Sequence, residues 1–387
     1  MGIAARMNEI KPSATLTITS KAKSMKAEGI DVISFGAGEP DFDTPDYIKN
    51  AAIEAIKKGK TKYTPSIGDL QLRQGIAEKL QSQNNLAYDA TDIAVSNGAK
   101  HALYNIFQVL CNPGDEVIIS APYWVSYPEM VRLSGASCVF AQTTKENGFK
   151  MDVKLLKSRI TDKTKAVIIN SPNNPTGCVY SKQELRPLVE LAISRHIAIV
   201  SDEIYERLIY GNIQHASVAG VVDDAIKNTI LVNGVSKTYS MTGWRIGYVA
   251  SKDKDFLVSY KKLQDHSSSN PCSISQAAAL TALKKEDSSV EDMKRAFQQR
   301  RDYMLDRIKS IELFSCVKPD GAFYCFIDVN KVNRDSLAFA SKLLDEAKVA
   351  VIPGEGFGAA GHIRMSFATG MEQIKNGFDR IEKWLRQ

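Results

Sequence analysis

Short apolar runs alternate with longer amphipathic stretches through most of this chain. From Asp92 onward, runs rich in β-branched residues recur, and helical patterns separate several of them. The runs are 93–95, 117–119, 139–140, 167–169, 197–200 and 230–232, with another at 246–249. Unbroken apolar runs of this length are typical of strands buried on both faces. The alternation predicts an α/β fold in which helices cover both faces of a mostly parallel sheet.

Two predicted helices have clear start signals. The stretch 181–196 begins with a capping box, in which Ser181 and Glu184 satisfy each other's backbone amides. Earlier in the chain, Thr44 and Pro45 have the order of a hydroxyl cap followed by a proline at the first helical position, which predicts a helix to about Lys58.

A glycine-containing turn follows the apolar run 33–35. Its sequence, Gly36-Ala37-Gly38-Glu39-Pro40-Asp41-Phe42, has aspartate where a dinucleotide-binding fingerprint needs its third glycine. The turn therefore argues against a Rossmann site. Its glycines indicate a tight turn or a close approach of the backbone to a ligand.

Residues with useful chemistry follow the apolar runs. They are Gly98, Ala99 and Lys100 after 93–95, Trp124 after 117–119, Asn174 after 167–169, Asp202 and Tyr205 after 197–200, and Lys237 after 230–232. Ligands of parallel sheets bind at the carboxyl ends of the strands. Each residue also has a structural explanation: Asp202 can cap a helix, Trp124 can fill a core, and Asn174 can begin a turn. Their common position at strand ends favours one ligand site.

Lys237 is the strongest single candidate. Most lysines are solvated surface charges, but this one lies between two apolar runs, 230–232 and 246–249. Partial desolvation lowers the pKa of a lysine and frees the neutral amine that a Schiff base needs. Arg245 follows eight positions later, and an amine beside an arginine suggests a ligand with a phosphate.

A second arginine, Arg364, lies in the apolar run 362–367 and requires an anion. The anion is either a carboxylate of the protein or a substrate carboxylate held by two parallel hydrogen bonds.

Composition narrows the class of protein. The 387 residues predict two domains, and the polar stretch 284–289 is the best candidate for their junction. A net charge of +6 without a basic stripe predicts no nucleic-acid binding. Without an apolar run of about 18 residues or a signal peptide, we expect a cytoplasmic protein that does not span a membrane. The six cysteines form no Cys-x-x-Cys pair and do not cluster with the five histidines, so we expect no metal site.

Several of these segments together resemble the class I aminotransferases, pyridoxal-phosphate enzymes of fold type I, and within them the bacterial aspartate aminotransferase branch. The segments are 38–42, 171–177, 201–205, 236–237 and Arg364. The resemblance implies a large domain with a seven-stranded, mostly parallel sheet, and a smaller α/β domain built from both termini. The predicted boundaries are 1–47 for the N-terminal arm and part of the small domain, 48–288 for the cofactor-binding domain, and 289–387 for the remainder of the small domain.

The resemblance also implies roles for individual residues. Lys237 would form the Schiff base with pyridoxal 5'-phosphate and shuttle the substrate proton, and Asp202 would keep the pyridine nitrogen protonated. Tyr205 and Asn174 would hydrogen-bond the phenolic oxygen of the ring, and Trp124 would stack on it. The phosphate would be held by Arg245, by the Gly98, Ala99 and Lys100 segment, and by Tyr63 of a second subunit, which makes the active site a property of a homodimer.

Substrate contacts are implied in the same way. Arg364 would bind the substrate α-carboxylate, with Gly38, Trp124 and Asn174 nearby. Lys100, Ser13 and Thr15 would receive an acidic side chain, and Lys11 would bear on whether prephenate is accepted; Lys100 as a surface lysine is an equal alternative.

The reaction implied is transfer of the amino group of L-aspartate to 2-oxoglutarate. Prephenate or aromatic amino-acid transamination is an alternative, as is a β-eliminating lyase on the same fold. A transcriptional regulator with an aminotransferase-like domain would need an added helix-turn-helix domain, and only about 30 residues precede the run 33–35.

Overall fold

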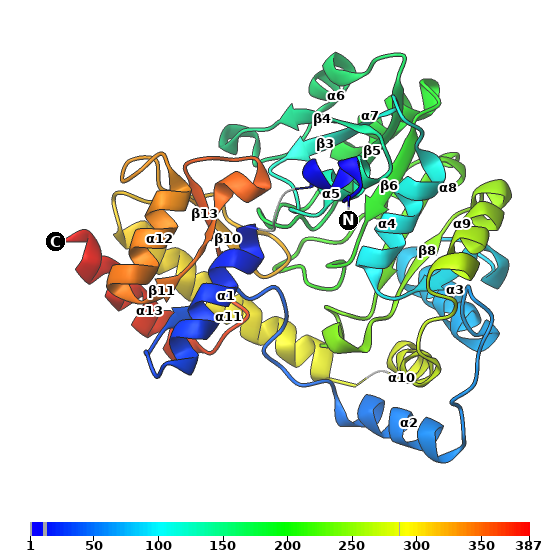
Figure 1. Ribbon diagram of the computed structural model, residues 1–387, viewed down its shortest axis with the longest axis horizontal. Coiled ribbons are helices and arrows are strands. Elements are labelled where there is room, and N and C mark those ends of the chain that lie inside the picture. The colour runs from blue at the N-terminus through cyan, green and yellow to red at the C-terminus, as the bar shows by residue number, and fades with distance from the viewer. Residues whose placement is uncertain (1, 11–13, 286) are drawn as a thin grey trace.

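A seven-stranded sheet forms the centre of the larger part of the molecule, which we call the large lobe (Figure 1). The computed structural model describes residues 2–10, 14–285 and 287–387, with the backbone alone for 14–17. In spatial order the strands are β2 (Ile93–Ser96), β8 (Gly247–Ala250), β7 (Thr229–Gly234), β6 (Ala198–Asp202), β5 (Thr164–Asn170), β3 (Glu116–Ala121) and β4 (Ser137–Gln142). Neighbours pair in parallel except at β8, which is antiparallel to both β2 and β7. The mostly parallel sheet predicted from the apolar runs is confirmed.

Helices cover both faces of this sheet because successive strand residues point to opposite sides. Val117 and Ile119 pack with one set of helices, whereas Ile118 packs with the other. The first set is α4 (Ala99–Leu110), α5 (Tyr127–Leu133) and α9 (Lys254–Ser267). The second is α6 (Val153–Arg159), α7 (Lys182–Ser194) and α8 (Ala225–Asn228), with α2 (Asp46–Lys57), α3 (Leu70–Asn84) and α10 (Ser273–Lys284) farther along the sheet.

Helix starts were predicted with mixed success. The capping box of α7 is present, with the Ser181 hydroxyl and the Glu184 carboxylate each accepting from the other's backbone amide. The predicted cap of α2 by Thr44 is wrong: Pro45 is the cap residue and the helix begins at Asp46. The Thr44 hydroxyl instead donates to the Ser240 carbonyl at 2.6 Å, because the loop after β7 packs against it.

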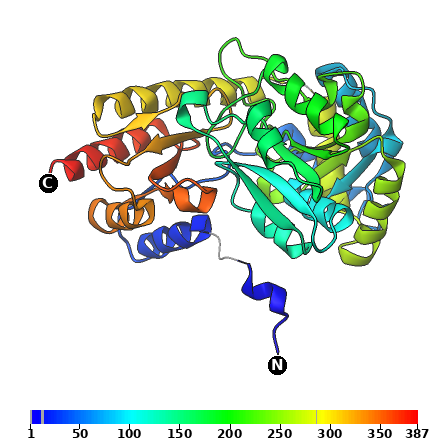
Figure 2. The same ribbon diagram turned by 90° about the horizontal axis from the view of Figure 1, so that it is seen from above.

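Both ends of the chain build the smaller part, which we call the small lobe (Figures 1 and 2). Its four-stranded sheet has the order β12 (Ile352–Pro353), β13 (His362–Ser366), β10 (Tyr324–Asp328) and β9 (Ser315–Cys316). N-terminal β1 (Ile33–Ser34) pairs in parallel with β11 (Val349–Ala350). The helices are α1 (Ala14–Ala27), α11 (Ser289–Ser310), α12 (Ser336–Ala347) and α13 (Met371–Leu385). The boundaries at residues 47 and 288 stay predictions.

Short 3-10 helices complete the described chain: η1 (Ala5–Asn8), η2 (Ala90–Asp92), η3 (Lys145–Asn147), η4 (Val218–Gly220), η5 (Thr242–Trp244) and η6 (Gly354–Phe357). Figure 2 shows η1 standing away from both lobes. None of the helices in the described part of the chain has the length and apolar character needed to cross a membrane.

Candidate active site

One cavity of about 330 Å³ lies at the carboxyl edge of the seven-stranded sheet. Strand β6 ends there at Asp202, and β7 ends three residues before Lys237. Because β8 runs in the opposite direction, its start brings Arg245 to the same edge. Of the residues predicted for the site, Gly38, Ala99, Lys100, Trp124, Asn174, Asp202, Tyr205, Lys237, Arg245 and Arg364 all line the cavity.

Asp202 is a buried carboxylate with two hydrogen-bond donors. The Tyr127 hydroxyl donates to Oδ2 at 2.6 Å, and the Ile204 amide donates to Oδ1 at 3.2 Å. Burial raises its pKa to about 6, while the Tyr127 hydrogen bond opposes that rise. Asp202 is therefore mostly ionised near neutral pH and suited to hold a cationic ring nitrogen.

Lys237 lines the same cavity as Asp202, and its Nζ donates to the Gly38 carbonyl at 2.6 Å. Burial lowers the pKa of its amine to about 8. The desolvation inferred from the flanking strands is thus present, and near neutral pH a useful fraction of the amine is neutral and nucleophilic.

Two tyrosines, one from each lobe, contact each other at the cavity. The hydroxyls of Tyr205, from the turn after β6, and Tyr324, from β10, lie 3.0 Å apart. Both side chains are buried, and burial raises the pKa of each phenol above its usual value. The two hydroxyls remain protonated and can donate to a ring oxygen in the cavity.

Arg364 is a buried arginine, 2% exposed, on β13. It donates to the Asn174 side chain at 3.0 Å and to the Gly36 carbonyl at 3.2 Å, and its guanidinium stacks on Tyr324 at 4.2 Å. Its buried Nε has no hydrogen-bond partner. Within the described ranges no carboxylate forms an ion pair with it, which favours a ligand carboxylate over one from the protein.

A second anion site lies at the start of α4. Gly98 precedes the helix with φ +84° and lies beside the guanidinium of Arg245, which donates to the Thr242 carbonyl at 2.8 Å and to the Asn97 carbonyl at 3.3 Å. A Cβ on Gly98 would meet this guanidinium at 2.2 Å, so a larger residue at position 98 would displace the Arg245 side chain. No ion pair of Arg245 occurs in the part of the chain described above. Helix amides and an unpaired guanidinium fit a phosphate.

Comparison with known families agrees with this geometry. The model for aminotransferase class I and II matches residues 30–381. The chain belongs to this family. Both the family and the fold inferred from the sequence are confirmed, and the family uses pyridoxal phosphate.

This aminotransferase has relatives that match over its full length. It is 49% identical over 389 residues to an aspartate aminotransferase of Bacillus sp. strain YM-2, with 99% of each chain covered. It is 46% identical to a protein of Aquifex aeolicus named a probable aspartate/prephenate aminotransferase, with 100% of this chain and 99% of the relative covered. The solved aspartate aminotransferase from Thermus thermophilus with maleate has a TM-score of 0.95 at 41% identity, with 99% of each chain covered.

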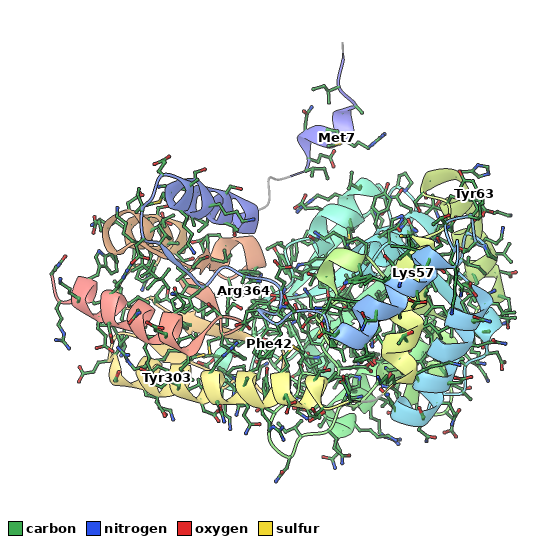
Figure 3. All side chains as sticks on the ribbon, turned by 90° about the horizontal axis from the view of Figure 1, so that it is seen from below. Met7, Phe42, Lys57, Tyr63, Tyr303 and Arg364 are labelled. Atoms are coloured by element: carbon green, nitrogen blue, oxygen red, sulfur yellow. The ribbon has the colours of Figure 1, made fainter. Side chains whose placement is uncertain are left out.

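Some predicted residues lie elsewhere in the aminotransferase. Tyr63 is 90% exposed on the outer flank of the large lobe, whereas Arg364 lies between the lobes (Figure 3). Lys11 and Ser13 lie outside the described residues, and the side chain of Thr15 is not described either. The roles given to these three stay predictions.

Other residues of the aminotransferase site escaped sequence reasoning. Tyr127, Tyr324, Ser236 and Asn170 line the cavity. Tyr127 lies at the start of α5, and its hydroxyl reaches Asp202 through a tertiary contact that its position in the sequence does not reveal. Tyr324 lies in the other lobe, and nothing local in its sequence separates it from core residues.

The residues present fit pyridoxal phosphate. Lys237, Arg245 and Arg364 supply three basic groups, while Asp202 is the buried carboxylate among them. This excess of positive charge suits a ligand with both a phosphate and a carboxylate, and the orphaned Nε of Arg364 marks the carboxylate position.

Proposed function

We propose that this aminotransferase transfers the amino group of L-aspartate to 2-oxoglutarate, forming oxaloacetate and L-glutamate, with pyridoxal 5'-phosphate as cofactor. The observation that carries the proposal is that Lys237, with a pKa lowered to about 8, shares one cavity with buried Asp202 and with Arg364, whose buried Nε has no hydrogen-bond partner among the described residues. Full-length relatives and the solved neighbour that bear the aspartate aminotransferase name support it.

When bound, the cofactor supplies an electron sink that stabilises negative charge at the substrate Cα. Side chains of the protein bind and orient the reactants and transfer the proton. Asp202 pairs with the protonated ring nitrogen, and Tyr127 keeps Asp202 ionised and oriented. Tyr205 donates to the ring oxygen together with Asn174, and Trp124 covers the ring.

Lys237 binds the cofactor and then moves the proton at the substrate Cα. Arg245 and the amides of Ala99 and Lys100 hold the phosphate. Arg364 binds the α-carboxylate, and its contacts with Asn174 and Gly36 fix the guanidinium before substrate arrives.

Lys100 is the proposed partner of the substrate's second carboxylate. Its ammonium lies 5.0 Å from the centre of the Trp124 ring, at the cavity wall, and burial lowers its pKa. No carboxylate among the described residues forms an ion pair with it, so a substrate carboxylate would compensate for its lost hydration. We expect Lys100→Ala to raise KM for aspartate far more than KM for an aromatic amino acid. Equal effects on both would contradict this role.

Tyr63 cannot serve the cavity of its own subunit, since it lies on the outer flank. We propose that it reaches the phosphate of a second copy, so that the active sites are shared in a homodimer. The proposal rests on the exposure of Tyr63 and on the family resemblance.

The test is spectroscopic. Purified protein loaded with pyridoxal phosphate is mixed with L-aspartate, and the cofactor's visible band is followed before and after 2-oxoglutarate is added. Loss and return of the band, with glutamate and oxaloacetate as products, supports transamination. Release of ammonia and pyruvate would support the β-eliminating lyase, and preference for prephenate as amino acceptor would support the other alternative. A Lys237→Ala protein that still cycled the cofactor would overturn the assignment.

A further inference from the structure

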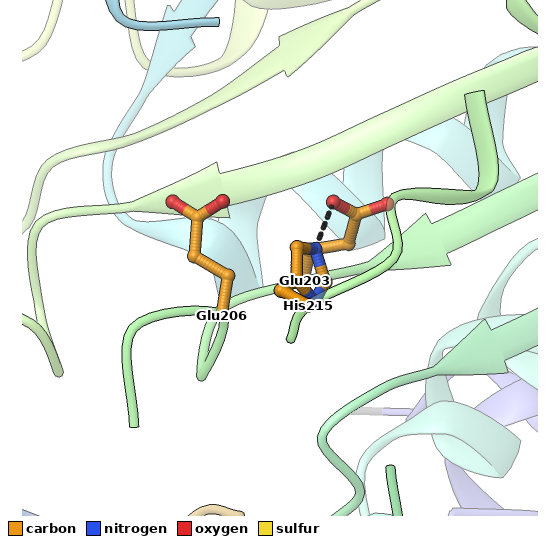
Figure 4. Close-up of side chains that lie close together, drawn as sticks. All are labelled: Glu203, Glu206 and His215. Carbon is orange, nitrogen blue, oxygen red and sulfur yellow. Dashed lines mark hydrogen bonds and ion pairs between the residues drawn. The ribbon is translucent and has the colours of Figure 1, made fainter. Parts of the chain in front are cut away.

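A buried charge network lies behind the cofactor site and has no part in the chemistry above. It consists of Lys79, Glu203, Glu206 and His215 (Figure 4 shows the last three). Side chains of Lys79, Glu203 and Glu206 are 6% exposed or less. Burying charges costs free energy unless each is paired, so such a network requires a reason.

Two ion pairs make up the network. Lys79, from α3, contacts the Glu206 carboxylate, which also accepts from Asn84 at 2.9 Å. His215 Nε2 lies 2.8 Å from Glu203 Oε2. The other oxygen of Glu203 accepts from the hydroxyls of Ser201 and Ser217, both at 2.8 Å, and from the Val218 amide at 3.2 Å.

Ligand atoms of Glu203, Glu206 and His215 lie within 4.8 Å of one another, close enough for a metal ion. The Lys79 ammonium already lies against Glu206, and Glu203 Oε1 accepts three hydrogen bonds. An added cation would meet that ammonium, so the network is better described as two internal ion pairs.

The segment after β6 presents two faces. Asp202 and Tyr205 point into the cavity, whereas Glu203 and Glu206 point into the network. Backbone bonds tie it down: the Glu203 amide donates to the Val232 carbonyl on β7, and the Glu206 amide donates to the Glu203 carbonyl. Whatever fixes Glu203 and Glu206 therefore fixes Asp202 and Tyr205.

We propose that this network is a positioning device for the cofactor site: it holds the segment 202–206 in place, and its charge sets how readily Asp202 ionises. Glu203 and His215 are positioning residues that act through Asp202. The proposal rests on the proposed use of pyridoxal phosphate, since Asp202 must be ionised to pair with the ring.

The charges of the network predict in which direction each of its residues shifts the ionisation of Asp202. The groups that face Asp202 are Tyr127 from α5, Lys237 from the loop after β7, Tyr205, and Glu203 beside it. The groups that face His215 are Glu203, Glu206 and Lys79. Burial opposes a charge on His215, but the hydrogen bond and charge of Glu203, together with the charge of Glu206, outweigh burial and raise the pKa of the imidazole. At mildly acidic pH His215 is thus a cation that offsets Glu203.

The test uses two variants that change the charge of the network in opposite directions. Glu203→Gln keeps an acceptor for the two serines but removes a negative charge, so Asp202 should stay ionised at lower pH. His215→Gln keeps a donor to Glu203 but removes a positive charge, so Asp202 should protonate at higher pH. The double variant should return close to wild type.

The readout is the affinity of the apoprotein for pyridoxal phosphate as a function of pH, with thermal unfolding in parallel. The acid limb of the affinity profile should move to lower pH in Glu203→Gln and to higher pH in His215→Gln, each by roughly half a pH unit or more. Asp92→Asn is the matched control, because Asp92 is a buried carboxylate paired with Lys252 at the opposite edge of the sheet. It should lower the unfolding temperature without moving the limb.

If the acid limb of the affinity profile moves in the same direction in both variants, or stays in place, the proposed role of the network is wrong. Wild-type protein that does not bind pyridoxal phosphate at any pH would overturn the proposed function as well, so the two failures are distinguishable.

Discussion

Burial shifts the pKa values of Lys237 and Asp202 in opposite directions. It lowers the pKa of Lys237 to about 8 and raises the pKa of Asp202 to about 6. Both shifts move the groups toward their neutral forms, and both are costs that folding has to offset. Stability of the protein without cofactor should therefore depend on Lys237 in a way that can be measured.

We expect Lys237→Met to stabilise the apoprotein at pH 7 by about 1–3 kcal/mol, because a poorly solvated charge is removed. The usual pKa of the lysine is 10.5, so between pH 8 and 10.5 the unfolded chain binds more protons than the folded one. Stability of the wild type then rises with pH through this window.

The advantage of Lys237→Met should accordingly shrink as pH rises from 8 to 10. Denaturant unfolding at pH 7 and pH 10 measures it, with exposed Lys182→Met as control. A constant advantage at both pH values would mean that the Lys237 amine is well solvated.

Tyr127→Phe should weaken binding of pyridoxal phosphate by roughly tenfold at pH 7, since hydrogen bonds to charged groups are worth about 1.5–3 kcal/mol. The lost donor also raises the pKa of Asp202. Titration of the apoprotein measures the affinity. Tyr260→Phe, which removes a buried hydroxyl bonded to Ser96 instead, should leave it unchanged; equal losses in both would point to a general packing defect.

Single residues were predictable where they follow a strand along the chain, as Asp202, Lys237 and Asn174 do. Tyr127 and Tyr324 were not, because their hydroxyls reach the site from a helix and from the other lobe. The pairing of His215 with Glu203 also depends on tertiary contacts that no spacing in the sequence reveals.

At the scale of elements, the phosphate site that we propose depends on a close approach of α4 to β8, where a Cβ on Gly247 would meet the Ala99 amide at 2.2 Å. The Cβ of an alanine at position 98 would meet Arg245, whereas one at Gly59, also at positive φ, would meet no atom within 4 Å. We expect backbone strain to destabilise both Gly→Ala variants, Gly98→Ala by about 1–3 kcal/mol, because φ 84° with ψ 162° lies in a region that is essentially restricted to glycine. Only Gly98→Ala should also lose affinity for pyridoxal phosphate, by tenfold or more, measured by titration. Equal affinity in the two variants would place the phosphate elsewhere.

The strands themselves were well predicted, since each apolar run between residues 93 and 249 lies in or overlaps a strand of the seven-stranded sheet. The reversed direction of β8 was not, because a run of apolar residues carries no information about strand direction. Thr44 shows a similar limit: its hydroxyl fits a helix cap locally, but it donates to the carbonyl of Ser240, nearly 200 residues later in the chain.

For the whole molecule, shared active sites can be tested by mixing subunits. Tyr63→Phe and Lys237→Ala homodimers should each be impaired. If Tyr63 acts in the partner's site, randomly reassembled mixed dimers hold one intact site, and about a quarter of wild-type site activity should return. If the activity of the mixture equals the summed activities of the two variant homodimers, Tyr63 acts in the site of its own subunit or in no site. The control for reassembly replaces Tyr63→Phe with Tyr303→Phe, because Figure 3 shows Tyr303 far from Tyr63.

The antiparallel pairing of β7 with β8 also bears on the order in which the site is assembled during folding. Lys237 and Arg245 both lie in the connection between these two paired strands, so closing that loop costs little entropy. The contact of Arg364 with Gly36, in contrast, closes a loop of 328 residues. We therefore expect the half of the site that takes the cofactor to form early, and the half that takes the substrate carboxylate to form last.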